Sequence, residues 1–157
     1  MKRLAEEDED VKERIEKIAL DYWGEVEVSE IEDQVFFELE SIQVEELWNR
    51  SGKKRYGYVE PSEEAWEMFR EGLEPFIRQM RKYQNLSMHE EAKKYCLGIL
   101  KGIYKFGKEE PTQFAEWATD APYNYFEVVF DKWKEKHENE DDVEEVEDII
   151  EKEMNDW

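Results

Sequence analysis

The stretch from 50 to 61 gathers the residue types in this chain that are best suited to bind another molecule. It holds four cations and two tyrosines, interspersed with glycines: Arg50, Lys53, Lys54, Arg55, Tyr56 and Tyr58. Basic side chains interleaved with aromatic rings can hold phosphates and stack on bases. The same side chains could instead form a rigid connector, in which the tyrosines pack on the protein and the lysines are solvated. Both interpretations stay open, and because loops often carry function, these six residues are the predicted binding site.

Side chains suited to catalysis or metal binding are few and scattered. The two histidines, His89 and His137, belong neither to a His-Glu-x-x-His motif nor to the Glu-x-x-His spacing of di-iron bundles. The one cysteine, Cys96, falls on an apolar helix face, where a buried thiol is expected. No glycine-rich phosphate loop of the Walker or dinucleotide type occurs. The sequence therefore predicts no catalytic residue, no metal site and no cofactor, and we expect that the protein is not an enzyme.

The elements that must position these residues are helices, and the central pair is predicted at 62–106. Apolar residues recur there every third or fourth position, which is the period of helices with one buried face. Pro75 interrupts the first helix, but the apolar pattern continues in phase beyond it, so we expect a kink rather than a break. The capping-box pattern Ser87-Met88-His89-Glu90 predicts that the second helix starts at Ser87.

Two glycines interrupt the second of these helices. Gly98 and Gly102 are four residues apart, so they share one helix face. Glycine within a helix costs roughly 1 kcal/mol relative to alanine. The pair therefore predicts that the backbone of another helix approaches closely at this face.

The rest of the chain also reads as helical. Further helices are predicted at 2–23, about 30–40, about 43–50, after Thr112, from Asp120, and from Val143 to the end, with a polar linker at 137–142. A short strand near 25–28 is the alternative for the alternating residues there. The predicted fold is all-α: a single-domain bundle of antiparallel helical hairpins, packed as in TPR or HEAT proteins. We divide it into a helical domain, 1–137, and an acidic C-terminal helix or tail, 138–157.

Charge is unevenly spread along the chain, whose formal net charge is −21. Residues 1–49 carry 5 basic and 17 acidic side chains, residues 50–108 carry 13 and 8, and residues 109–157 carry 4 and 18. The acidic C-terminal segment is therefore expected to fold back on the basic centre. No stretch resembles a signal peptide or a membrane span, which favours a cytoplasmic protein without membrane contact.

The leading functional hypothesis is a non-enzymatic interaction or accessory module that binds a protein partner through the surface of its helical hairpins. The alternative is a nucleic-acid-associated protein that uses the basic and aromatic residues at 50–58, with the acidic tail as an intramolecular mask. The net charge disfavours nucleic acid, because phosphates would be repelled. The oligomeric state is left open.

Four stretches of this sequence resemble a helical region of uncharacterised prokaryotic proteins, some of which carry a SWIM-type zinc finger ahead of the helices. They are ELWNRSG at 46–52, YGYV at 56–59, LEPF at 73–76 and CLGILKGIY at 96–104. The resemblance covers about 25–135 and implies a stand-alone helical accessory domain. The finger itself needs several cysteines, which this chain lacks, so its zinc and nucleic-acid roles do not carry over.

Overall fold

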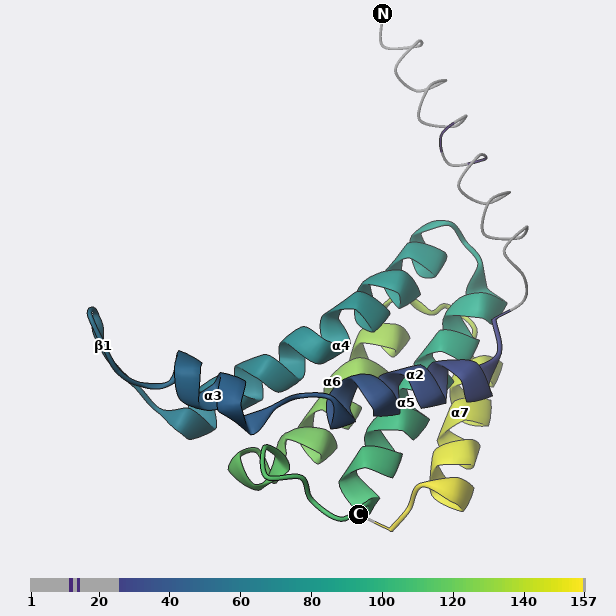
Figure 1. Ribbon diagram of the computed structural model, residues 1–157. Helices are drawn as coiled ribbons and strands as arrows, with labels where there is room; N and C mark the ends of the chain where they lie inside the picture. The colour runs from purple at the N-terminus through teal and green to yellow at the C-terminus, as the bar shows by residue number, and fades with distance from the viewer. Residues whose placement is uncertain (1–11, 13, 15–25, 157) are drawn as a thin grey trace, which may run out of the picture.

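Helices make up most of the chain that the structure describes. The computed structural model describes residues 12, 14 and 26–156. Its elements are α2 (Val28–Glu40), α3 (Val44–Arg50), β1 (Gly52–Lys54), β2 (Gly57–Val59), α4 (Pro61–Asn85), α5 (His89–Lys108), a 3-10 helix (Ala115–Trp117), α6 (Ala121–Lys136) and α7 (Glu140–Glu153) (Figure 1). The predicted all-α bundle is confirmed. The helix predicted at 2–23 lies outside the described residues, apart from positions 12 and 14. None of the described helices combines the length and the apolar character that a membrane crossing requires.

The central hairpin predicted at 62–106 is formed by α4 and α5, which pack against each other. α4 runs without interruption through Pro75, so this proline does not end the helix. The apolar residues of both helices contribute to one core, among them Phe69, Leu73 and Ile103, which have no exposed surface. The spacing of the apolar residues was therefore a sufficient guide to this part of the fold.

The turn between α4 and α5 differs from the predicted capping box. Ser87 has a φ of +58° and makes no side-chain cap, and α5 begins only at His89. The N–H of Ser87 donates to the carbonyl of Gln84 (3.0 Å), and the N–H of Met88 donates to the carbonyl of Tyr83 (2.9 Å). This pair of bonds is the Schellman arrangement that closes a helix at its C-terminus. Ser87 therefore ends α4 in the left-handed conformation and cannot also cap α5.

The two glycines of α5 mark the place where α2 packs on it, as predicted. An added Cβ at Gly102 would lie 2.6 Å from Cβ of Val35 and 2.9 Å from the carbonyl oxygen of Glu32. An added Cβ at Gly98 would lie 2.6 Å from Cγ2 of Ile31. These distances are shorter than van der Waals contact, so a side chain at either glycine would force the two helices apart.

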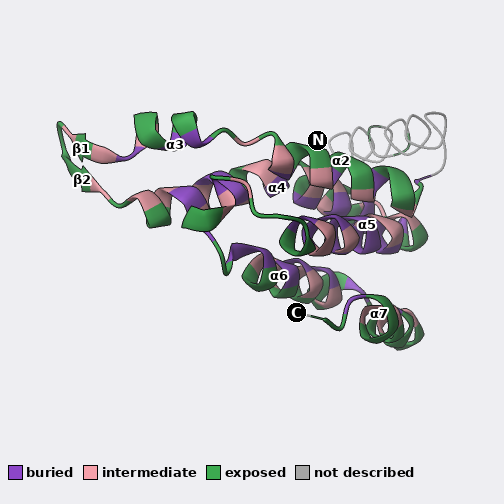
Figure 2. Cartoon of the chain, turned by 60° about the horizontal axis from the view of Figure 1, so that its bottom comes forward, coloured by how far each residue is buried: buried purple, intermediate pink, exposed green. Residues whose placement is uncertain are grey.

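α5 is the helix around which the others are arranged. It contacts α2, α4 and α6. α2 and α4 lie on one side of it and α6 and α7 on the other (Figure 2). On the second side, α6 buries Trp133 completely, and α7 buries Val146. The helices that carry the surface residues described below are therefore packed around one largely buried helix, α5.

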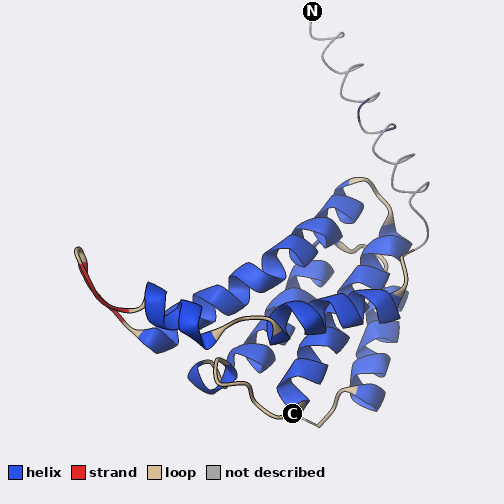
Figure 3. Cartoon of the chain, in the orientation of Figure 1, coloured by secondary structure: helices blue, strands red, loops and turns tan. Residues whose placement is uncertain are grey.

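Within the segment predicted as a loop at 50–61, residues 52–59 form a β-hairpin (Figure 3). β1 and β2 pair antiparallel, with Gly52 opposite Val59, Lys53 opposite Tyr58 and Lys54 opposite Gly57. These are the only strands among the described residues. The alternative strand near 25–28 does not form at the described positions 26–28, because Val28 already begins α2.

Candidate interaction surfaces

The β-hairpin at 52–59 projects from the bundle, away from the core helices (Figures 1 and 2). Lys53 and Tyr58 are directly opposite each other, so their side chains lie on the same face of the hairpin. Tyr56, in the turn, is 82% exposed, and Tyr58 is 64% exposed. The alternative in which these tyrosines pack on the protein is therefore wrong for both rings.

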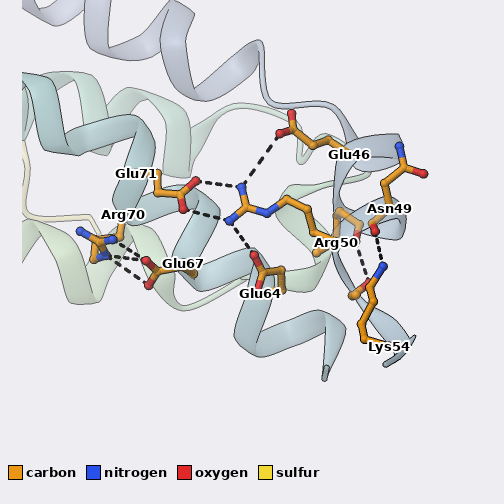
Figure 4. A network of polar contacts seen from close by, with 10 residues as sticks. Glu46, Asn49, Arg50, Lys54, Glu64, Glu67, Arg70 and Glu71 are labelled. Atoms are coloured by element: carbon orange, nitrogen blue, oxygen red, sulfur yellow. Dashed lines mark hydrogen bonds and ion pairs between the residues drawn. The ribbon is translucent and has the colours of Figure 1, made fainter. Parts of the chain in front are cut away.

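Arg50, the first residue of the predicted site, is held by carboxylates of its own chain (Figure 4). Its guanidinium donates two hydrogen bonds to Glu71, of 2.8 and 2.9 Å, and lies 2.6 Å from Oε1 of Glu64. Glu46 is 4.0 Å away. The hydrogen bonds with Glu71 raise the pKa of Arg50 and lower the pKa of Glu71 from their usual values. Arg50 therefore fastens α3 to α4 and has little capacity left for a phosphate.

The remaining five residues of the predicted site fall into two groups. Lys54 is half-buried, and its ammonium donates to the carbonyl oxygen of Asn49 at the end of α3 (Figure 4). The other four residues are exposed: Lys53, Arg55, Tyr56 and Tyr58. Neither Lys53 nor Arg55 forms an ion pair with a described residue. The hairpin thus presents to solvent two rings and two cations that have no ion pair with a described residue, and their role in binding stays a prediction.

A second surface feature, absent from the sequence-based site, is a groove of about 590 Å³ between α6 and α7. Its apolar lining includes Phe130, Ile150 and Met154. Carboxylates from both helices line it as well: Glu127 and Asp131 on α6, and Glu147 and Glu151 on α7. Lys134 is the one cation of the lining, with Nζ 4.3 Å from the centre of the Phe130 ring and 3.5 Å from Asp131. The groove is an apolar trough with a strongly negative rim.

Its acidic helix, α7, is fastened to the bundle by a polar cluster. Lys93 of α5 lies 3.3 Å from Oδ1 of Asp142 and 2.6 Å from Oε2 of Glu145. The other oxygen of Asp142, Oδ2, lies 2.8 Å from Nε2 of His137. Because a carboxylate can only accept, Nε2 carries the proton of this bond. The bonds from His137 and Lys93 lower the pKa of Asp142 below its usual value.

His137 was assigned to a polar linker at 137–142, yet its side chain is completely buried. Its ring lies 4.4 Å from the Trp133 ring, centre to centre, and α7 already begins at Glu140. Lys101 of α5 also pairs with Glu153 at the end of α7 (3.3 Å). The acidic segment thus folds back on the basic centre, on α5 rather than on the hairpin. The signal in the sequence was the combination of apolar periodicity and opposite charge.

The histidine, cysteine and acidic side chains of the described residues bear on possible metal binding and nucleophilic chemistry. These residues include no cluster of three or more His, Cys, Asp or Glu side chains that could hold a metal ion. Cys96 is completely buried, and burial raises the pKa of its thiol far above the usual value. A thiol in that state is a poor nucleophile.

Comparison of the chain with models of known protein families, with curated proteins and with solved structures finds no match. The resemblance to a helical region of uncharacterised prokaryotic proteins therefore stays a prediction. The two surfaces that bear on function are the hairpin and the groove.

Proposed function

We propose that the protein is a non-catalytic interaction module that binds a segment of a partner protein in the groove between α6 and α7. The observation that carries this proposal is the combination of an apolar trough with four carboxylates on its rim. Helical surfaces commonly bind partners by taking large apolar side chains into such a groove. The helical hairpins, from which partner binding was predicted, supply both walls.

The chemistry of the lining defines the segment that fits. Phe130 and Ile150 offer apolar surface, so one or two large aromatic or aliphatic side chains should fill the trough. Glu147 and Glu151 have no ion-pair partner among the described residues, so lysine or arginine beside those apolar side chains would be favoured. The expected partner segment is therefore basic and apolar, and its encounter should slow as salt is added.

A charge placed in the trough should abolish this binding. Ile150→Glu places a carboxylate where an apolar side chain of the partner is to dock. We expect affinity for the partner to fall tenfold or more, because loss of a contact at the centre of an interface costs about 2 kcal/mol of binding free energy. The measurement is recovery of specific proteins from native lysate by the immobilised chain, followed by titration with the identified partner.

Ile149→Glu is the matched control, because the neighbouring isoleucine is also half-buried on α7 but does not line the groove. Both variants should first show the helical circular dichroism of the unaltered chain. Equal recovery of the same partner by the unaltered chain and by folded Ile150→Glu would contradict the proposal.

The projecting hairpin favours a second candidate, nucleic-acid association. Lys53 and Arg55 could pair with phosphates, and Tyr56 and Tyr58 could stack on bases, each stack contributing about 1–3 kcal/mol. We expect Tyr56→Ala to weaken single-stranded oligonucleotide binding at low salt, and affinity to fall steeply as salt rises. A gel shift measures both. Exposed Lys152→Ala on α7 is the control, and no shift with the unaltered chain at low salt would end this candidate.

A further inference from the structure

The hairpin and the groove have complementary chemistry. The hairpin offers Lys53 and Arg55, without ion pairs to described residues, beside the exposed rings of Tyr56 and Tyr58. A basic segment with large apolar or aromatic side chains is the kind that fits the groove. The groove offers apolar surface for rings and carboxylates for cations.

These two surfaces cannot meet within one molecule. The hairpin projects from one end of the bundle, beyond α3, whereas α7 lies at the opposite side of the molecule in both views (Figures 1 and 2). The strands are only three residues long and begin directly after α3, which Arg50 ties to α4 through Glu71. A contact between hairpin and groove therefore has to join two copies.

We infer that the hairpin of one copy of this chain enters the α6–α7 groove of a second copy, which links the molecules head to tail. This inference rests on the proposed function, because it names the segment that the groove takes. In it, Tyr56 and Tyr58 fill the apolar trough, and Lys53 and Arg55 face the carboxylates of Glu147 and Glu151. Charge complementarity selects this occupant, since the two cations of the hairpin meet the two carboxylates of α7.

A nucleic acid suits the hairpin less well than a second copy does. The segments that flank the hairpin in the chain carry exposed carboxylates, Glu45 and Glu46 on α3, Glu60 just before α4 and Glu63 in its first turn. A polyanion long enough to pass the hairpin would meet these carboxylates, in a chain of net charge −21. A groove in another molecule receives only the projecting residues.

The contact joins different surfaces of the two copies, so it does not close on itself as a two-fold dimer does. Such contacts produce open chains or rings. A hairpin in a groove is a small interface, of the size found in weak and transient complexes. Association is therefore expected at high protein concentration, and at physiological salt, where repulsion between the acidic molecules is screened within about 8 Å.

Sedimentation equilibrium with two complementary variants tests the inference. One variant disables the hairpin (Arg55→Glu with Tyr56→Ser), and the other disables the groove (Glu147→Lys with Glu151→Lys). All four positions are exposed, so both variants should fold. The unaltered chain should show an average mass that rises with concentration beyond twice 19.1 kDa. Each variant alone should stay at 19.1 kDa, and their mixture should reach twice that mass and no more.

The mixture is decisive because it contains one intact hairpin and one intact groove. A monomeric unaltered chain, a mixture that stays monomeric, or variants that associate as the unaltered chain does would each overturn the inference.

A synthetic basic and aromatic peptide separates the failure of this inference from the failure of the proposed function. If that peptide binds the groove while the unaltered chain is monomeric, the inference falls and the proposed function stands. If the peptide also fails, both fall. A monomeric chain that binds oligonucleotide through the hairpin assigns the hairpin to nucleic acid and overturns the inference.

Discussion

Replacing Gly102 by alanine is expected to destabilise the protein by about 2 kcal/mol, although alanine is the better helix former. The new methyl group would meet Cβ of Val35 and the carbonyl oxygen of Glu32, both parts of α2 that no side-chain rotation can move away. Forcing an atom into a packed interface costs about 1–3 kcal/mol, and the close approach of backbone places this site near the upper end. The gain in helix propensity offsets at most about 1 kcal/mol of that. The measurement is the free energy of unfolding from urea denaturation.

Gly72→Ala is the matched control for this effect. Gly72 also lies within a helix, α4, but an added Cβ would be 3.6 Å from the nearest atom, on Leu39, which is ordinary contact. Alanine at position 72 should therefore stabilise the protein by up to about 1 kcal/mol. If both variants moved the free energy of unfolding in the same direction, the close packing of α2 on α5 would not be what fixes glycine at 102.

The second large effect is expected at the cluster beneath α7. Asp142→Ala should destabilise the protein by about 2–3 kcal/mol, because it leaves the buried ring of His137 without its partner and removes one partner of the buried Lys93. His137 would lose the hydrogen bond of Nε2, and its Nδ1 has no partner among the described residues. Lys93, whose side chain is 8% exposed, would keep its pairs with Glu145 and Glu90 alone. Partial exposure of Asp142 keeps the effect below that of a fully buried pair.

Glu144→Ala is the control for Asp142→Ala. Glu144 is exposed on the same helix and has no ion pair with a described residue, so its loss should change the free energy of unfolding by less than about 0.5 kcal/mol. Denaturation of the two variants side by side separates the cluster from a general effect of removing negative charge from α7. Equal losses in the two variants would contradict the role given to the cluster.

The contribution of Asp142 should also depend on pH in a defined direction. Its pKa is lower in the folded protein than in the unfolded chain, where an aspartate titrates near 3.9. The ionised carboxylate therefore stabilises the fold fully above that value, and the contribution is lost as pH falls through the lower folded pKa. Urea denaturation from pH 7 to pH 3 should show the difference between the unaltered chain and Asp142→Ala shrinking on acidification. A difference that grew instead would contradict this assignment.

The spacing of residues along the chain predicted those parts of the fold that depend on near neighbours in the sequence. The apolar periodicity located α4 and α5, and the glycine pair indicated the close approach of a helix before its identity as α2 was known. The role of Arg50 could not be predicted, because Glu71 lies 21 residues away and is brought close only by the packing of α3 on α4. Ser87 fitted the local rule for the start of α5, but the ending of α4 prevailed and holds it in the left-handed conformation.

The candidate site was predicted in part for the same reason. The six residues at 50–58 were identified by composition, but their hairpin was missed. Its strands of three residues carry no apolar alternation, and the glycines read as a loop. The groove between α6 and α7 was missed because its lining comes from two helices whose relative placement depends on a buried histidine and lysine.

The seclusion of Cys96 has one more consequence. With its sulfur enclosed by the core and its ionisation suppressed, the native molecule should be inert toward iodoacetamide and maleimides. Alkylation would then occur only in molecules that have opened around α5. The rate of adduct formation would therefore report how often the protein opens around α5. Since the chain carries no other thiol, every adduct would arise from Cys96.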